Sequence, residues 1–364
     1  MEDFSSSDTI KWIFLFLLCV ACIILALCFQ KSSTSVLAPV AGVPFGVPTP
    51  TSFPPLTFDS VFRQDHTWVN HLGQDHVRVL VATGDVIPAR SVNFQTVKYN
   101  DFTWGWKYIA PLLEAGDVTL INLESPLVPN CPVTNSGMIF CGDQRHIQGL
   151  VFAGVDVANF ANNHMGNWGA EGISETKQLL NDSGIKASGL GEPTVVEVKG
   201  MKFVFLGFDD IGPTVVPIAG SDEEEMKKEI EEAKTIGDIV VVSMNWGVEY
   251  TDGPTERQQY LAHAAIDFGA DLIIGNHPHW IEPVEIYKGK VIMYAYGNTI
   301  FDQMWSEETK EGVIGKYTFC DKDLVDIEFI PTYIKDYGQP EILEGVKKLS
   351  ILDRLEKISL NASL

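Results

Sequence analysis

The sequence predicts an α/β fold for most of the chain, and two patterns lead to this prediction. Short apolar runs rich in β-branched residues recur along the sequence, and stretches with helical periodicity lie between several of them. Strands that are buried on both faces read as continuous apolar runs, so we expect helices or a second sheet on both sides of the predicted sheet. The predicted strands cover residues 77–82, 118–122, 155–160, 203–208, 239–244, 271–274 and 291–296.

Three stretches between these runs are predicted to be helices. Residues 171–181 have helical periodicity and end near Gly184. Residues 222–235 begin with acidic side chains, which interact favourably with the positive end of the helix dipole. Residues 254–268 start with a proline and end before Gly269, which is the asymmetry expected at the two ends of a helix.

The composition of the 364-residue chain is that of an ordinary globular protein, with 45% apolar and 20% charged residues. It excludes a wholly disordered chain, a collagen-like repeat and a small disulfide-rich scaffold. The formal net charge is −22, from 26 Lys and Arg against 48 Asp and Glu. Because so acidic a chain repels polyanions, we expect no nucleic-acid partner.

An apolar run near the N-terminus predicts a membrane anchor. Residues 12–29 carry no formal charge and are nearly all apolar, and Lys11 and Lys31 flank them. At ~1.5 Å per residue, a helix of this length just crosses a hydrocarbon core of ~30 Å. We therefore expect a short tail over residues 1–11, a transmembrane helix over 12–30 and a single-pass protein of the cell membrane.

The alternative interpretation of this run is a cleaved signal peptide. The first ten residues hold three acidic side chains and neither Lys nor Arg, and no small-residue cleavage site follows the run. Both features disfavour a signal peptide. Lys11 and Lys31 nearly balance, so charge encodes the membrane orientation only weakly.

Residues 31–58 are predicted to be a linker, and residues 59–364 a single folded domain. The stretch 32–55 is rich in Ser, Thr, Pro, Gly and Val, contains six prolines and carries no charge, which is a spacer composition. The chain that follows is long enough for one domain that buries ~75% of its unfolded surface. No second linker and no internal repeat interrupts it.

Two of the six cysteines stand ten residues apart in a loop rich in Pro, Asn and Gly. Cys131 and Cys141 could close a disulfide hairpin, or they could be two unrelated thiols, and the spacing alone leaves both open. A disulfide would place the domain in an oxidising compartment outside the membrane. Three further cysteines lie in the apolar run near the N-terminus, and Cys320 stands alone.

Polar side chains follow six of the predicted strands, at the point where each strand ends. Ligands of open α/β folds bind beyond the carboxyl ends of the strands. Carboxylate, amide and imidazole groups that reach this edge from several strands therefore predict a metal site there. The residues are Asp85, Glu124, Asn163, His164, Asn245, His277, His279, Asn298 and Asp302.

The strongest part of this pattern is His277-Pro278-His279. Two imidazoles one residue apart on an extended turn point the same way, and histidine is the usual nitrogen ligand of divalent metals. The other residues have structural alternatives. Asp85 and Asn298 could make Asx turns, Glu124 could cap a segment and His164 could be a buried imidazole with satisfied hydrogen bonds.

The remaining histidines are interpreted as structural or exposed. Three of them precede the first strand, match no helix or strand face, and are expected in solvent. His146 follows Arg145 and could line a substrate channel, although a surface position is favoured, and His263 is expected to be a core or surface residue of its helix. The three that precede the first strand are His66, His71 and His76.

The ordered motifs resemble the poly-γ-glutamate capsule-synthesis family of CapA or PgsA type, a branch of the calcineurin-like metallophosphoesterase superfamily. The resemblance covers residues 77–302, and the ordered set is specific even where single motifs are not. The motifs are Gly84-Asp85-Val86-Ile87-Pro88-Ala89-Arg90, Asn122-Leu123-Glu124, Ala161-Asn162-Asn163-His164, Asn245-Trp246-Gly247-Val248-Glu249-Tyr250, Gly275-Asn276-His277-Pro278-His279 and Tyr296-Gly297-Asn298-Thr299-Ile300-Phe301-Asp302-Gln303.

This resemblance implies a four-layer α-β-β-α sandwich with a centre of one or two metals. His164 would be the counterpart of the general acid, and Arg90 would hold an anionic group. Mn, Zn or Fe would suit the mixture of carboxylate and imidazole groups. The implied metal ligands are Asp85, Glu124, Asn163, His277 and His279, and the residues implied to surround them or to contact substrate are Asn245, Glu249, Asn298 and Asp302.

One departure from the family pattern bears on the metal. The usual His-Trp-Gly of the family is Asn245-Trp246-Gly247 in this chain, so an amide that binds only weakly through oxygen replaces a nitrogen ligand. The family's first strand also ends in Asp85-Val86-Ile87 rather than the Asp-x-His of the superfamily. We therefore expect one divalent metal, or a weakly loaded site.

Three functions follow as hypotheses. The first is a membrane-anchored protein whose extracytoplasmic domain takes part in the synthesis or export of a capsular or cell-envelope polymer such as poly-γ-glutamate. It would work with membrane synthase or export subunits and contact an acidic polymer or envelope glycan through the cation, Arg90 and Arg145. The second is a metal-dependent hydrolase of phosphoester or amide bonds, in which His164 protonates the leaving group. The third is a non-catalytic scaffold of the same fold.

Overall fold

A computed structural model of the chain describes residues 53–63, 65–138 and 140–362. The predicted tail, the predicted anchor and most of the predicted linker lie outside these described residues. Within the described ranges, no helix is both long enough and apolar enough to cross a membrane.

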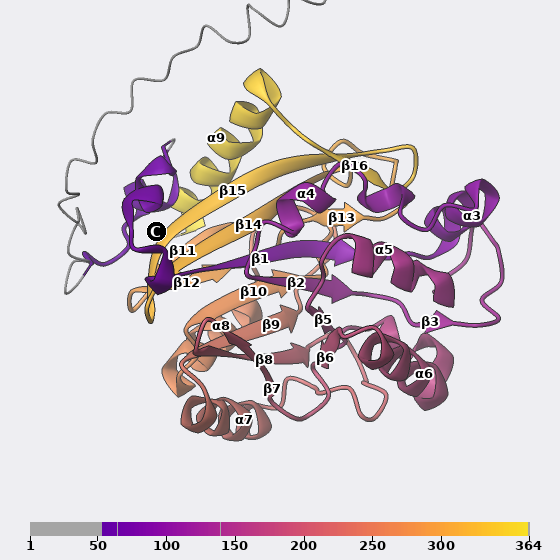
Figure 1. The fold of residues 1–364 in the computed structure, drawn as a ribbon, viewed down its shortest axis with the longest axis horizontal. Coiled ribbons are helices and arrows are strands. Elements are labelled where there is room, and N and C mark those ends of the chain that lie inside the picture. The colour runs from indigo at the N-terminus through magenta and orange to yellow at the C-terminus, as the bar shows by residue number, and fades with distance from the viewer. Residues whose placement is uncertain (1–52, 64, 139, 363–364) are drawn as a thin grey trace, which may run out of the picture. The chain divides into compact units, whose positions relative to one another are not determined.

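The first of two mixed sheets has β1 at its centre (Figure 1). On one side of β1 the strands β2, β5 and β6 run parallel to it, and on the other side β14, β15 and β16 form an antiparallel meander. The short strand β13 also pairs with the end of β1. The bounds are β1 (Val77–Val86), β2 (Val118–Leu123), β5 (Val157–Asn159), β6 (Lys186–Ser188), β13 (Asn298–Ile300), β14 (Glu311–Cys320), β15 (Asp323–Lys335) and β16 (Gln339–Ile342).

The second sheet has the order β11-β12-β10-β9-β8-β7. Its four central strands are parallel, and the two edge strands β11 and β7 pair antiparallel with their neighbours. The bounds are β7 (Thr194–Val198), β8 (Met201–Asp209), β9 (Ile239–Asn245), β10 (Leu272–Asn276), β11 (Val284–Tyr287) and β12 (Lys290–Met293).

The two sheets pack against each other through one apolar core. Alternate residues of a strand point to opposite faces, and Leu80 of β1 and Val241 of β9 belong to this shared core. Their sequence neighbours Val81 and Val242 point outward into two further cores, one on each outer face. The α/β class predicted from the apolar runs is therefore confirmed, with helices, two sheets and helices in successive layers.

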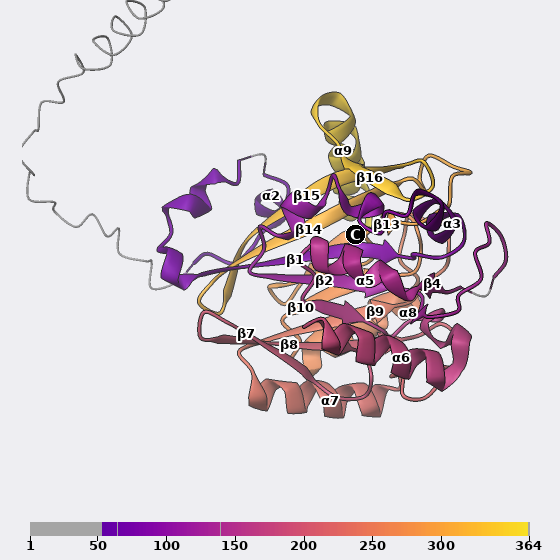
Figure 2. The same cartoon turned by 45° about the vertical axis from the view of Figure 1, so that its right-hand side comes forward.

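Helices cover both outer faces (Figures 1 and 2). The predicted helices 171–181, 222–235 and 254–268 correspond to α6, α7 and α8, and Asp222 and Thr255 cap the last two through their side chains. The bounds are α2 (Phe58–Val61), α3 (Arg90–Tyr99), α4 (Ala110–Leu113), α5 (Ile147–Phe152), α6 (Gly169–Asp182), α7 (Glu223–Ile236), α8 (Glu256–Phe268) and α9 (Gly345–Ala362).

The long hairpin of β14 and β15 had not been predicted from the sequence. Residues 311–320 pair with residues 323–333, and intermediate or exposed positions interrupt the buried residues of both strands. Polar residues such as Lys316 and Glu328 sit opposite each other in the pairing, so neither strand reads as a continuous apolar run. Helix α9 packs on β15 through the apolar side chains of Ile351 and Leu355.

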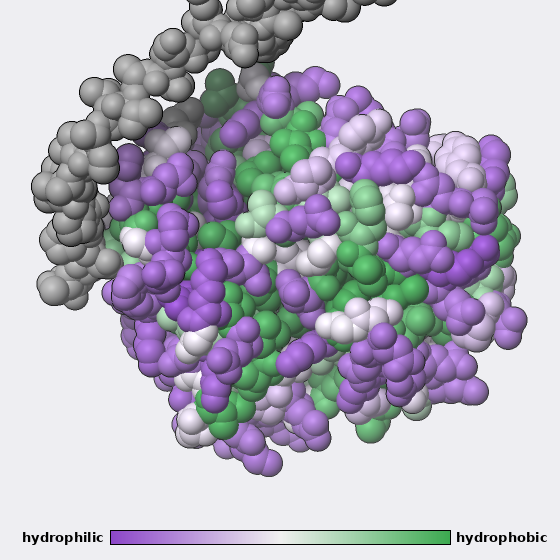
Figure 3. Space-filling view, in the orientation of Figure 1, coloured by the Kyte–Doolittle hydropathy of each residue, from purple (hydrophilic) through white to green (hydrophobic). Residues whose placement is uncertain are grey.

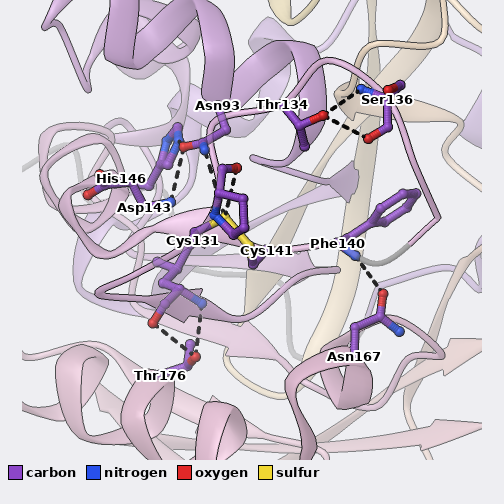
Figure 4. Close-up of a disulfide and its surroundings, with 12 residues drawn as sticks. Asn93, Cys131, Thr134, Ser136, Phe140, Cys141, Asp143, His146, Asn167 and Thr176 are labelled. Carbon is purple, nitrogen blue, oxygen red and sulfur yellow. Dashed lines mark hydrogen bonds between the residues drawn. A yellow bond between two sulfur atoms is a disulfide. The ribbon is translucent and has the colours of Figure 1, made fainter.

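Cys131 and Cys141 form a disulfide, which resolves the alternative left open by their spacing (Figure 4). The bridge closes a loop between β3 (Leu127–Val128) and β4 (Gly142–Asp143). Cys320 is a free, buried thiol.

Two predictions about the remaining histidines are wrong. His66, expected in solvent, is half-buried and its Nδ1 lies 2.8 Å from Oδ2 of the buried Asp326. His146, expected at the surface, is buried against Phe102, and its Nε2 lies 3.1 Å from Asn93 Oδ1. In both cases the partner comes from a distant segment, which local spacing does not reveal.

The surface of the domain carries both hydrophilic and hydrophobic residues. In the face seen in Figure 3, hydrophilic residues surround smaller hydrophobic areas.

Candidate metal centre

The carboxyl ends of β1 and β2 from the first sheet and of β9 and β10 from the second meet at one edge of the molecule, where the arrowheads lie in Figure 1. Register aligns Asp85 with Asn122 in the first sheet and Asn276 with Asn245 in the second. The edge predicted from the strand ends is therefore formed by both sheets together.

Three buried side chains at this edge could hold one metal ion. Ligand atoms of Asp85, Glu124 and His279 all lie within 4.8 Å of one another. The Oδ2 atom of Asp85 lies 2.9 Å from His279 Nδ1, and the backbone N–H of His277 donates to its Oδ1 at 3.4 Å. The set offers two carboxylates and an imidazole, which suits a divalent transition metal.

The two carboxyl groups of this triad differ in their proton affinity. Burial acts to raise the pKa of Asp85, but hydrogen bonds from His279 and Asn122 bring it below its ordinary value. Burial and the negative charge of Asp85 raise the pKa of Glu124 well above its ordinary value. A bound cation would stabilise both carboxylates in their ionised form.

Unpartnered acceptors around the triad fit a cation. Among the described residues, Glu124 Oε1, Asn245 Oδ1 and His277 Nδ1 are buried without a hydrogen-bond partner, and so is Asp209 Oδ2. Burial lowers the pKa of His277 to about 3, so its ring is neutral and able to coordinate. Buried polar atoms without partners are costly, and a cation would satisfy several at once.

Three asparagines that the sequence analysis had not assigned to the site hold the first sheet's carboxylates in place. Asn122 Nδ2 donates to Asp85 Oδ1 at 2.9 Å and lies 3.4 Å from Glu124 Oε2. Asn122 Oδ1 in turn accepts from Asn159 Nδ2 at 3.1 Å and from Asn162 Nδ2 at 3.2 Å. Asn122 is the last residue of the predicted strand 118–122 and Asn162 follows the predicted strand 155–160, so their positions could have identified these two. Asn159 lies inside the predicted strand 155–160 and carries no such signal.

Asp209 is the carboxylate that the sequence analysis missed. It ends β8, and Asn245 Nδ2 donates both to its Oδ1 at 2.9 Å and to Asn163 Oδ1 at 3.1 Å. Burial raises the pKa of Asp209 to about 6, although the Asn245 amide acts to lower it. Asp209 directly follows the run 203–208, so the strand-end rule applied to this run would have found it.

Arg90 and His164 lie together at the side of the triad. The Arg90 guanidinium pairs with Asp302 and lies 4.7 Å from the Phe140 ring centre and 4.8 Å from that of Phe301. The His164 ring stacks on Phe140 with centroids 4.0 Å apart. Arg90 Nε is buried without a partner among the described residues.

Glu249 and Asn298 are also at this edge. Glu249 is half-buried, and its charge acts on both Glu124 and His164. Asn298 Nδ2 donates to Thr309 O at 2.9 Å and to Gln303 Oε1 at 3.2 Å, so this amide braces the loop after β13. Its Oδ1 is buried without a partner among the described residues.

The backbone around the two histidines departs from the expected extended turn. His277 has φ 96° and His279 has φ 59°, both in the left-handed region that side chains disfavour. The two imidazoles consequently differ in surroundings, since His279 contacts Asp85 and the His277 Nδ1 atom has no partner in the described part of the chain. Such strain concentrates at functional sites.

Glycines allow the two sheets' strand ends to come this close to neighbouring loops. A Cβ atom at Gly84 would lie 1.9 Å from Gly297 O, and one at Gly275 would lie 1.9 Å from Tyr294 O. A larger residue in place of Gly84 would displace the strand end that carries Asp85, and one in place of Gly275 would displace the strand end that leads to His277.

Glu282 links the loop of the two histidines to helix α8. Its backbone N–H donates to Ala295 O at 3.0 Å, and its Oε2 accepts from Gln258 Nε2 at 2.7 Å. Burial raises the pKa of Glu282 to about 8, although the hydrogen bond from Gln258 acts to lower it. The folded state therefore favours the protonated carboxyl.

Glu282 should make the protein less stable as the pH rises from about 4.5 to about 8. Over this range the Glu282 carboxyl is ionised in the unfolded chain but still protonated in the folded chain, so the free energy of unfolding falls as the pH rises. Outside this range the contribution of Glu282 to the free energy of unfolding does not change with pH. Glu282→Gln should remove this slope and be the more stable protein above pH 8. Denaturant unfolding at a series of pH values measures the difference, and parallel curves for the two proteins would contradict the assignment.

Metal binding should depend on the histidine loop. We expect the full chain, purified from metal-replete expression, to contain close to one equivalent of a transition metal, and the double variant His277→Ala/His279→Ala to lose it. Elemental analysis measures both. His263→Ala is the matched control, because His263, on helix α8, pairs with Glu285 of strand β11 and takes no part in the triad. A double variant that kept its metal would contradict the site.

Comparison with known proteins places the chain in a family. A family model described as bacterial capsule synthesis protein PGA_cap matches residues 79–303. The PGA biosynthesis protein CapA of Bacillus subtilis (strain 168) is 30% identical over 275 residues, which cover 70% of this chain and 71% of that protein. The capsule biosynthesis protein CapA of Bacillus anthracis is 28% identical over 300 residues, covering 76% of this chain and 72% of that one.

Among solved structures, a phosphatase from Mycoplasma pneumoniae aligns with a TM-score of 0.46 at 14% identity, covering 75% of this chain and 96% of that chain. This likeness is too distant to bear on activity. The matched family region contains every residue placed at the metal centre, from Asp85 to Asp302. The chain belongs to the PGA_cap family of bacterial capsule synthesis proteins.

Proposed function

We propose that this protein takes part in the synthesis or export of a capsular or cell-envelope polymer of poly-γ-glutamate type, through one divalent metal ion at Asp85, Glu124 and His279. The buried triad is the observation that carries the proposal, because its ligand atoms lie within 4.8 Å of one another and unpartnered acceptors surround it. Family membership supports the polymer class. Mn, Zn or Fe would suit the donor set, and the domain would be a sandwich of metallophosphoesterase type.

The domain would act outside the membrane, anchored by residues 12–30. The disulfide between Cys131 and Cys141 supports this location, because disulfides persist in oxidising compartments and are rare in the cytosol. Membrane synthase or export subunits would then be its partners, since a single anchored domain cannot move a polymer across a bilayer.

Contact with an acidic polymer has to overcome charge repulsion. The chain carries a net charge of −22, and the two arginines expected to contact the polymer are already paired, Arg90 with Asp302 and Arg145 with Asp143. The bound cation is therefore the main positive charge available to a carboxylate of the polymer. Polymer binding should depend strictly on the metal.

This dependence can be measured with the full chain in detergent and a poly-γ-glutamate of defined length. We expect binding with added Mn²⁺, and at least about tenfold weaker binding with a chelator or in His277→Ala/His279→Ala, which corresponds to ~1.4 kcal/mol. His263→Ala should bind like the parent protein. Binding that is absent under all conditions, or that survives chelation, would refute the proposal.

Hydrolysis is the second candidate function, and the position of His164 favours it. Its ring lies close enough for the charges of His279 and Glu249 to act on it, and burial lowers its pKa below the ordinary value. The metal ion would supply Lewis-acid chemistry, Arg90 would orient an anionic substrate group, and the imidazole would exchange a proton with the leaving group.

His164→Ala tests this second function. With bis-p-nitrophenyl phosphate or a γ-glutamyl oligomer as substrate, we expect the variant to lose turnover by ~10²–10⁴-fold, the usual contribution of a general acid–base group. Its metal content should match that of the parent protein, which separates lost chemistry from a lost site. Absence of turnover in the parent protein with Mn²⁺, Zn²⁺ and Fe²⁺ would leave polymer binding as the function and exclude hydrolysis of these substrates.

A further inference from the structure

The loop closed by the Cys131–Cys141 disulfide reaches the candidate site through Phe140. Phe140 directly precedes Cys141, is buried, and packs on both the His164 ring and the Arg90 guanidinium. The loop also contacts the start of helix α3, where Arg90 Nη1 lies 3.4 Å from Gly137 O. The disulfide is more than twenty residues from His164 in the sequence, but Cys141 directly follows Phe140, on which the His164 ring stacks.

The same loop fixes the orientation of a side-chain amide. The backbone N–H of Phe140 donates to Asn167 Oδ1 at 2.7 Å (Figure 4). A backbone N–H can only donate, so the Asn167 atom that faces it must be the oxygen and not the NH₂ group. The amide is thereby locked in one of its two orientations.

This orientation determines which ring nitrogen of His164 carries the proton. Asn167 Oδ1 also lies 3.1 Å from His164 Nδ1. An oxygen that accepts cannot donate, so the neutral ring must place its hydrogen on Nδ1 to make this bond. The Nε2 atom, on the other side of the ring, then has a free lone pair.

We propose that Asn167, held by the Phe140 backbone in the disulfide-closed loop, is the positioning residue that fixes His164 as the Nδ1–H tautomer and presents its Nε2 atom to the metal centre. The proposal deepens the proposed function, on which its relevance to catalysis rests. It assigns a role to the disulfide as well. Opening the loop would free Phe140, and with it the amide orientation and the tautomer of His164.

The tautomer can be observed without any substrate. The full chain, labelled with ¹⁵N in its histidine rings and loaded with diamagnetic Zn²⁺, would be studied by magic-angle-spinning NMR at a pH where the rings are neutral. Protonated and unprotonated ring nitrogens have well-separated ¹⁵N shifts, and the spectrum of His164→Gln identifies the His164 signals by subtraction. We expect His164 to be purely the Nδ1–H form.

Three variants then test the cause. Asn167→Leu, which removes the acceptor at nearly the same size, should give a mixture of both tautomers, whereas Asn167→Asp, which keeps an acceptor, should retain Nδ1–H. Cys131→Ser/Cys141→Ser should also give a mixture, and Cys320→Ser, which removes the free buried thiol, should not. The His263 signal, set by its contact with Glu285, reports whether each variant remains folded.

Two results would overturn the proposal, namely an Nε2–H form of His164 in the parent protein or an unchanged Nδ1–H form in folded Asn167→Leu. An unchanged spectrum in the cysteine variant would refute the role of the disulfide. Failure of the proposed function has a different signature. A parent protein with the expected tautomer but neither polymer binding nor hydrolysis would retain the Asn167 assignment and refute the function.

Discussion

Asp85 and His279 are 194 residues apart in the sequence, and the 2.9 Å contact between them joins the edges of the two sheets. Both side chains are almost fully buried, and burying a carboxylate is costly unless it is paired and hydrogen-bonded. Asn122 and the backbone of His277 supply the further hydrogen bonds. The apolar core brings the two sheets together, and this buried pair fixes the geometry of the candidate metal centre where their strands end.

Amide side chains do much of the positioning around this pair. The NH₂ group of Asn122 donates to Asp85, and its side-chain oxygen accepts from Asn159 and Asn162. One neutral side chain therefore positions both the carboxylate and the residues at the end of the next strand. Neutral amides achieve this without adding charge to a site that already holds several carboxylates. The result is a preorganised cluster in which the unpartnered carboxylate and amide oxygens of Glu124, Asp209 and Asn245 could bind a cation.

The site is asymmetric in a way that bears on substrate recognition. Hydrogen-bond acceptors from both sheets surround the triad, while Arg90, Phe140 and His164 pack together at one side of it. Phe140 belongs to the loop closed by the disulfide. The charge of Arg90 is largely compensated by Asp302. The Arg90 guanidinium is therefore held between a carboxylate and two aromatic rings.

The apolar runs alone predict the strands β1, β2, β5, β8, β9, β10 and β12 and three of the helices, because burial on both faces leaves continuous apolar runs. The polar residues directly after these runs predict the candidate site, whereas the hairpin of β14 and β15 carries no such pattern. Only the tertiary structure decided which strands share a sheet, which of the acceptors lack partners, and that His277 and His279 adopt left-handed backbone conformations. The pairing of His146 with Asn93 and the hydrogen bond that orients the Asn167 amide were likewise decided by the packing. The physical reason is that hydrogen bonds between residues far apart in sequence depend on the packing of the two sheets, which no local pattern encodes.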